Sequence, residues 1–192
     1  MRIISGRFKG RNLVSFKADH IRPTTDRVKE TLFNILMHDV AEQRVLDLFA
    51  GTGNLGLEAL SRGAKDVTFV EAHRDSIKII RENIRLLKVE KECEIIAKDV
   101  FRFLKDDRGG PYHLIFCDPP FTEKIAHPTM GALANSPCVE YGSIAVIESS
   151  RHERIDDVYE SDRKGAFQLL DRRQFGDKSA SFFVFKPKEP PK

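Results

Sequence analysis

Short runs of mostly apolar residues alternate with stretches of helical spacing along most of the chain. The runs predict strands buried on both faces of a sheet at 45–49, 67–71, 94–97, 112–117 and 143–148. Apolar residues spaced three or four positions apart predict helices at 27–37, 55–62, 75–88 and 125–135. Because strand and helix alternate from 44 to 148, we expect an α/β fold with a mainly parallel sheet and helices on both faces.

The two ends of the chain depart from this alternation. Segments 2–5 and 12–16 flank a Gly-Arg-Phe-Lys-Gly turn and predict a small N-terminal β-hairpin. Segments 167–173 and 180–186 are joined by so short a connection that they predict a C-terminal antiparallel hairpin. Residues 151–164 are rich in charge and predict a surface helix or loop. We therefore expect a sheet of seven strands.

Composition narrows the class of protein. The chain has 192 residues, 41% of them hydrophobic and 32% charged, which suits one sizeable globular domain. No apolar run approaches the roughly 20 residues that cross a membrane, and the N-terminus lacks the apolar core of a signal peptide, so we expect a cytoplasmic protein. Three widely spaced cysteines include no C-x-x-C pair and suggest no metal site. Since no long apolar stripe is left over, we expect a monomer.

The segment 45–60, VLDLFAGTGNLGLEAL, combines a buried strand, a glycine turn and the start of a helix. These are the parts of a nucleotide-type ligand site at the edge of a parallel sheet. Gly51, Gly53 and Gly56 have the G-x-G-x-x-G spacing, which also marks NAD-binding folds and is weak evidence on its own.

Carboxylates near this loop change the interpretation. Asp47 lies inside the strand, where it suits a cationic amino group better than a pyrophosphate. Glu71 ends the next strand about 20 residues after the turn, where a carboxylate suits the two hydroxyls of a ribose. Asp99 ends a third strand and is a candidate acceptor for an adenine amino group, or a helix N-cap. This pattern points to S-adenosylmethionine, with an NAD-dependent oxidoreductase as an alternative.

The stretch Asp118-Pro119-Pro120-Phe121 follows directly on an apolar strand. Proline cannot donate to a sheet and has a fixed φ, so the strand ends here in a rigid turn. Such a turn aims the Asp118 carboxylate and the Pro119 carbonyl at one point, with the Phe121 ring as a platform beside them. Two acceptors and a stacking surface suit an amino group on a planar heterocycle. The motif therefore predicts catalysis by positioning and electrostatics, with a rigid Pro-Pro turn as the plainer alternative.

Positive charge is concentrated near the N-terminus. Residues 1–30 carry eight basic and three acidic residues, a net charge of +5, while the whole chain carries +3. This imbalance suggests contact with a polyanion, although a solvated basic face on a packed helix gives the same pattern. The candidate nucleic-acid-binding residues are Arg7, Lys9, Arg11, Arg22 and Arg27. Lys29 belongs to the same basic stretch as Arg22 and Arg27, at the start of the predicted helix.

Three stretches together resemble one known family. D-P-P-F resembles the (D/N/S)-P-P-(Y/F/W) motif of amino-methylating, S-adenosylmethionine-dependent class I methyltransferases, which have a Rossmann-like fold. With R-P-T-T-D-R-V-K-E-T-L-F-N-I-L at 22–36 and L-D-L-F-A-G-T-G-N-L-G-L-E-A-L-S-R-G-A at 46–64, the chain looks like the RsmD family. Members of that family are bacterial methyltransferases that modify the exocyclic amine (N2) of a guanine in 16S ribosomal RNA of the small subunit.

The resemblance implies roles for the candidate residues. Asp118, Pro119 and Phe121 would receive the target base, and a folded RNA would have to present an unpaired guanine to them. We expect a basic hairpin extension at 1–21, a methyltransferase domain at 22–186 and a frayed tail at 187–192. The candidate cofactor-binding residues are Asp47, Gly51, Gly53, Asn54, Glu71, Asp99 and Val100.

Two further alternatives remain open at this point. One is an amine methyltransferase that acts on DNA adenine or a protein glutamine amide, although such relatives tend to carry Asn in place of Asp118. The other is a non-catalytic RNA-binding factor that assists ribosome assembly and retains the fold. The basic N-terminal segment favours nucleic acid over protein, since it would contact phosphates without reading the sequence.

Overall fold

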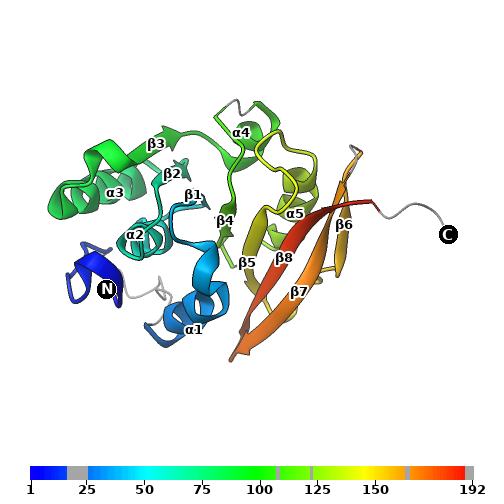
Figure 1. Cartoon of the computed structure of the whole chain (residues 1–192), viewed down its shortest axis with the longest axis horizontal. Coiled ribbons are helices and arrows are strands. Elements are labelled where there is room, and N and C mark those ends of the chain that lie inside the picture. Colours follow the sequence, from blue (N-terminus) through cyan, green and yellow to red (C-terminus); the bar gives the residue numbers. More distant parts are fainter. Residues whose placement is uncertain (17–25, 107–108, 122, 163–164, 189–192) are drawn as a thin grey trace. The chain divides into compact units, whose positions relative to one another are not determined.

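The computed structural model describes residues 1–16, 26–106, 109–121, 123–162 and 165–188 (Figure 1). The chain divides into two compact units, Met1–Asp99 and Val100–Lys192. We describe each unit by itself.

The first unit is built on three parallel strands in the order β3-β2-β1. The strands are β1 (Arg44–Leu48), β2 (Asp66–Glu71) and β3 (Cys93–Ala97). The α-helices are α1 (Asp26–Leu36), α2 (Asn54–Ser61) and α3 (Arg74–Leu87). One stripe of α3 is buried, as its apolar spacing predicts, and α2 is buried on all sides. Short 3₁₀ turns lie at Gly6–Phe8, Met37–Asp39 and Glu90–Glu92.

The two arms of the N-terminal segment pair as predicted, since the Ile3 N–H donates to the Arg11 carbonyl and the Leu13 N–H to the Met1 carbonyl, both at 2.9 Å, but they do not form the full strands of a β-hairpin. A single antiparallel bridge joins Arg2 and Asn12, and a 3₁₀ turn at Gly6–Phe8 lies between them. The reason is that side chains of α2 bind the backbone of this segment. The Glu58 carboxylate accepts hydrogen bonds from the Ile4 and Ser5 N–H groups at 2.9 and 3.1 Å, so these donors do not enter a ladder.

Lys29 is the residue whose environment differs most from the prediction. The sequence places it beside the basic residues that are expected to contact a polyanion, and this role is wrong for Lys29, because its side chain is fully buried. Its Nζ atom donates to the Arg2 carbonyl oxygen at 2.6 Å and to Asn54 Oδ1 at 2.8 Å, and lies 3.0 Å from Glu58 Oε2. Burial lowers the pKa of Lys29, and the charge of Glu58 opposes that shift.

The buried pair joins three segments that are distant in sequence. Lys29 belongs to α1, Glu58 to α2, and the Arg2 carbonyl to the N-terminal segment. Glu58 also accepts from Arg62 Nε at 2.8 Å, which lies one turn further along the chain. Four donors therefore share the two oxygens of one buried carboxylate, which satisfies its charge inside the protein.

The second unit combines parallel and antiparallel strands in the order β4-β5-β8-β7-β6. Strands β4 and β5 are parallel, and the pairs that follow are antiparallel. The strands are β4 (Leu114–Cys117), β5 (Ile144–Ser150), β6 (Val158–Glu160), β7 (Gly165–Phe175) and β8 (Lys178–Pro187). The α-helices are α4 (Val100–Asp106) and α5 (Ala126–Ala134). Its core contains the fully buried rings of Phe116, Phe167, Phe182 and Phe183.

The predicted α/β class is confirmed, with parallel strands first and antiparallel strands at the C-terminal end. The described residues contain eight strands instead of seven, because β6 forms within 151–164, where a helix or loop was predicted. Of its three residues only Tyr159 is buried, so the strand is too short to show a pattern. The Tyr159 hydroxyl lies 3.0 Å from His127 Nδ1 and accepts a hydrogen bond from the Asp156 N–H.

Two other features concern the described residues alone. None of their helices combines the length and apolar character that spanning a bilayer requires. Within the same residues, no group of three His, Cys, Asp or Glu side chains could hold a metal ion. The domain boundaries at 21 and 186 stay predictions, and residues 189–192 of the predicted tail lie outside the described residues.

Replacing Lys29 by methionine is expected to lower the free energy of unfolding by about 3 kcal/mol, because the Glu58 charge would lose a buried partner. Lys78→Met is the matched control, since Lys78 forms an exposed pair with Asp75 on α3 and is expected to change stability by less than about 0.5 kcal/mol. Urea unfolding of both variants measures the difference. Equal stability of the two variants would contradict the structural role of the buried pair.

Candidate active site

The glycine loop connects β1 to α2 through strained backbone. Phe49, Gly51 and Gly53 all have positive φ, at 57°, 57° and 77°. Positive φ is ordinary for glycine but costs about 1–3 kcal/mol for a residue such as Phe49, so the surroundings must hold it in place. Gly53 N–H closes the turn by donating to the Ala50 carbonyl at 2.7 Å, and Gly53 then caps α2.

Asp47 is buried inside β1 and binds the start of the following helix. The residue is only 2% exposed, and its Oδ2 atom accepts a hydrogen bond from the Gly56 N–H at 2.9 Å. This N–H lies in the first turn of α2, where backbone donors have no partner within the helix. An ionised carboxylate has acceptor sites for more than one donor, so Asp47 can hold the helix and also meet a cationic group.

Glu71 fixes the opposite side of the same loop. It ends β2, and its Oε2 accepts from the Gly51 N–H at 2.8 Å while Oε1 accepts from the His73 N–H at 2.8 Å. The structure therefore brings Asp47, the glycines and Glu71 together at the carboxyl ends of β1 and β2, as the sequence predicted. Open parallel sheets bind ligands at this edge.

The remaining candidate cofactor residues have different environments. Asp99 is exposed, two residues beyond the end of β3 and directly before α4. Val100 begins α4 and is 3% exposed. Asn54 is buried at the start of α2, where its side-chain oxygen accepts from Lys29. Its side chain therefore stabilises the helix packing.

Asn83 was missed by the sequence prediction and contacts the glycine loop directly. It is fully buried on α3, and its Nδ2 donates to the Thr52 carbonyl at 3.0 Å. The same amide accepts from the Val14 N–H at 2.7 Å and donates to the Val14 carbonyl at 3.0 Å. The sequence signal that could have identified it is the position of an asparagine beside the apolar stripe of α3. A buried amide there needs fixed hydrogen-bond partners.

Gly51 and Gly56 differ in how closely other atoms approach them. Among the residues that the structure describes, a Cβ atom added to Gly51 would meet the Phe49 carbonyl oxygen alone, at 3.8 Å. A Cβ added to Gly56 would lie 2.5 Å from the Phe69 ring and 3.0 Å from Asp47 Oδ2. A carboxylate at each end and approachable backbone between them fit S-adenosylmethionine, which has an ammonium group, a ribose and no phosphate.

The Asp118–Phe121 motif begins directly after β4 in the second unit. The Asp118 side chain is 29% exposed, so the carboxylate is accessible to a ligand. Lys178, at the start of β8, places its Nζ 3.8 Å from Asp118 Oδ1 and 4.5 Å from the centroid of the Phe121 ring. The sequence prediction did not include Lys178, because 60 residues separate it from the motif and only the sheet pairing brings it there.

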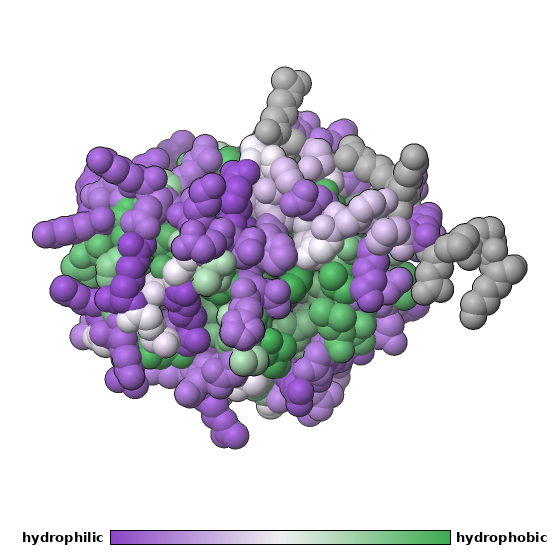
Figure 2. Space-filling view, in the orientation of Figure 1, coloured by the Kyte–Doolittle hydropathy of each residue, from purple (hydrophilic) through white to green (hydrophobic). Residues whose placement is uncertain are grey.

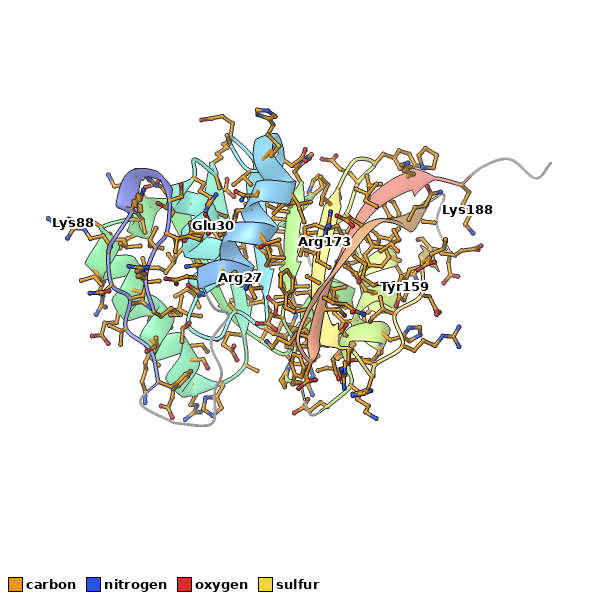
Figure 3. The ribbon with its side chains drawn as sticks, turned by 90° about the horizontal axis from the view of Figure 1, so that it is seen from below. Arg27, Glu30, Lys88, Tyr159, Arg173 and Lys188 are labelled. Atoms are coloured by element: carbon orange, nitrogen blue, oxygen red, sulfur yellow. The ribbon has the colours of Figure 1, made fainter. Side chains whose placement is uncertain are left out.

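The candidate RNA-binding residues are mostly exposed in the first unit. Lys9, Arg11 and Arg27 are exposed, and Arg27 is seen on α1 in Figure 3. Arg7 is also exposed and pairs with Glu92. Arg22 lies outside the described residues. In the view of Figure 2, hydrophilic side chains cover much of the surface.

Replacing Gly56 by alanine is expected to destabilise the fold by about 1–3 kcal/mol, because the new Cβ would overlap Phe69 and Val67. Gly131→Ala in α5 is the matched control, since a Cβ there meets nothing within 4 Å. The control is expected to leave stability unchanged or to raise it by up to about 1 kcal/mol, because alanine favours helix. Thermal or urea unfolding distinguishes the two, and a neutral Gly56→Ala would contradict the tight packing beneath the loop.

Comparison with known proteins agrees with this geometry. Residues 1–184 match the family model described as "Conserved hypothetical protein 95". The chain is 38% identical over 153 residues to Ribosomal RNA small subunit methyltransferase D of Haemophilus influenzae, covering 79% of each protein. It is 36% identical over 149 residues to the protein of that name in Escherichia coli K12, covering 78% of this chain and 74% of the relative.

Solved structures give the same result. The structure of yhhF from Escherichia coli superposes with a TM-score of 0.83 at 30% identity, covering 98% of this chain and 99% of the other. These matches select a methyltransferase over an NAD-dependent oxidoreductase. The chain belongs to the RsmD family of class I, S-adenosylmethionine-dependent ribosomal RNA methyltransferases.

Proposed function

We propose that this protein methylates the exocyclic amino group of a guanine in small-subunit ribosomal RNA. The relatives named above are small-subunit ribosomal RNA methyltransferases by name, at 36–38% identity. The observation that supports an amine as the methylated group is the Asp118-Pro119-Pro120-Phe121 turn at the end of β4. It combines an accessible carboxylate, a rigid backbone acceptor and an aromatic ring.

The first unit is proposed to hold the cofactor, which supplies an electrophilic methyl group when bound. Asp47 would accept from the ammonium group, and the backbone of Gly51 and Gly53 would hold the methionine part. Glu71 accepts from the ribose hydroxyls while it continues to bind the Gly51 N–H. Because the loop is already fixed by Glu71, little conformational entropy is lost when the cofactor binds.

The other cofactor residues are proposed to act in less direct ways. Asp99 accepts from the adenine amino group, as its exposed position after β3 allows. Val100 adjoins Asp99, and because its side chain is buried, contact with adenine would come from its backbone. Asn54 acts through its backbone at the start of α2, since its side chain binds Lys29.

The second unit is proposed to receive the guanine. Asp118 and the Pro119 carbonyl accept the two hydrogens of the amino group, and the Phe121 ring stacks on the base. This arrangement disfavours delocalisation of the nitrogen lone pair into the ring, so that the lone pair could attack the methyl carbon. The bond between that carbon and the cofactor sulfur would break as the new bond forms, and the sulfur would leave as the neutral thioether S-adenosylhomocysteine. Asp118 then accepts the proton that the methylated, cationic nitrogen releases.

The exposed basic residues of the first unit are proposed to contact RNA phosphates. Lys9, Arg11 and Arg27 are suited to this role, together with Arg7 when its pair with Glu92 opens. Such contacts position an RNA without reading its sequence. Selection of the guanine therefore depends on its being unpaired and on the fit of its amino group. We further propose that the enzyme acts as a monomer in the cytoplasm.

Replacing Asp118 by alanine is expected to reduce methyl transfer by about 100- to 1,000-fold, because an acceptor aimed at the developing charge is removed. The measurement is transfer of labelled methyl from S-adenosylmethionine to small ribosomal subunits that lack the modification, with naked ribosomal RNA and DNA tested in parallel. Binding of the cofactor, measured by calorimetry, is expected to stay unchanged, since its proposed ligands are unaltered.

Asp177→Ala is the matched control for this variant. Asp177 lies in the turn before β8, and its side chain is 77% exposed. We expect this variant to transfer methyl groups at the normal rate. Full activity of Asp118→Ala would contradict the proposed catalytic role, and labelling of DNA in place of ribosomal RNA would favour a DNA amine as the substrate.

A further inference from the structure

Lys178 is the residue that connects the base-receiving motif to the buried part of the second unit. Its ammonium group lies 3.3 Å from Glu148 Oε2, 3.8 Å from Asp118 Oδ1 and 4.5 Å from the centroid of the Phe121 ring. Two of these three partners, Asp118 and Phe121, are the residues that are proposed to bind the target base. The third, Glu148, lies on the neighbouring strand β5.

The position of Lys178 is determined by the sheet and by Glu148. Strands β5 and β8 are antiparallel partners, in which Lys178 lies opposite Ser150 and Ala180 opposite Glu148. The Glu148 side chain is only 3% exposed. A buried carboxylate is costly unless a cation or hydrogen-bond donors compensate it, so Glu148 holds the ammonium group in place.

The contacts from this anchored ammonium to the motif have defined physical effects. The 3.8 Å separation from Asp118 Oδ1 is an ion-pair distance, so the ammonium group attracts the carboxylate and limits the positions that its oxygens can take. A cation within about 6 Å of a ring centroid is attracted to the face of the ring, which restricts the orientation of Phe121. Both groups are thus arranged before a base arrives.

The charge balance also suits the reaction. Asp118, Glu148 and Lys178 together carry a net charge of −1 when all three are ionised. The target nitrogen becomes cationic as it is methylated, so a net negative environment stabilises it. Lys178 reduces the repulsion between the Asp118 and Glu148 carboxylates, and the net charge of the three groups stays negative.

We propose that Lys178 is a positioning residue for methyl transfer, which holds the Asp118 carboxylate and the Phe121 ring in the arrangement that receives the guanine amine. This inference rests on the proposed function of Asp118. The competing explanation is that Lys178 only neutralises Glu148 and thereby stabilises the fold. The two explanations differ in what happens when the Glu148 charge is removed as well.

The experiment compares four variants in the labelled-methyl assay on small ribosomal subunits that lack the modification. Lys178→Met removes the ammonium group, and Lys178→Arg keeps a cation that can pair with Glu148. The double variant Lys178→Met/Glu148→Gln removes both charges of the pair, so that no uncompensated buried charge remains. Lys186→Met is the matched control, because Lys186 is an exposed lysine on the same strand.

Positioning predicts that kcat falls about 10- to 100-fold in Lys178→Met and in the double variant, because a reacting group held slightly out of place slows the reaction steeply. Lys178→Arg is expected to recover at least part of this loss. Binding of S-adenosylmethionine and the thermal midpoint of the double variant are expected to match the wild type. Lys186→Met is expected to keep kcat within about twofold, as for most surface substitutions.

Two results would overturn the inference. If the double variant recovers normal kcat, Lys178 serves only to neutralise Glu148. If Lys178→Met and Lys186→Met show the same kcat and differ from the wild type only in the KM for the subunit, Lys178 is a general phosphate contact. Retained activity of Asp118→Ala overturns the proposed function and this inference with it, whereas an inactive Asp118→Ala beside a fully active Lys178→Met overturns this inference alone.

Discussion

The buried pair between Lys29 and Glu58 is the interaction on which the first unit depends. It joins α1 to α2, and the same two side chains bind the backbone of the N-terminal segment through the Arg2 carbonyl and the Ile4 and Ser5 N–H groups. Two charges removed from water stabilise a fold only when nearly all their hydrogen-bonding capacity is used, which makes this arrangement intolerant of change. Its consequence for function is that α2, which begins directly after the glycine loop, is held in one position by contacts of Lys29 with Asn54 and Glu58.

A second set of contacts transmits that rigidity to the loop itself. Asp47 binds the first turn of α2, Glu71 binds the Gly51 N–H, and Asn83 binds the Thr52 carbonyl. These three side chains come from β1, β2 and α3, so the loop is supported from separate elements. Support of this kind explains how Phe49 keeps a positive φ, and it means that the candidate cofactor site is formed before any ligand binds.

Much of this architecture could be predicted from the sequence, and the exceptions have physical causes. The apolar runs, the glycine spacing and the Asp-Pro-Pro-Phe turn are local patterns, and the elements that they predict are present within a few residues. The burial of Lys29 could not be predicted, because lysine is seldom fully buried and its partner Glu58 lies on a different helix. Strand β6 was missed because three residues show no periodicity, and Lys178 because its position near Asp118 results from long-range strand pairing. Contacts between distant segments are set by packing, which a single sequence does not display.

The central claim is that the reaction occurs on the exocyclic amine of a guanine. The most direct test is to label small ribosomal subunits with methyl groups from S-adenosylmethionine, digest their RNA to nucleosides and identify the labelled nucleoside by mass spectrometry. The account predicts that the label is found in guanosine methylated on its amino nitrogen. Label on a ring nitrogen, on the ribose or on another base would contradict it, because the acceptors and the ring of the Asp118–Phe121 turn are suited to an amine.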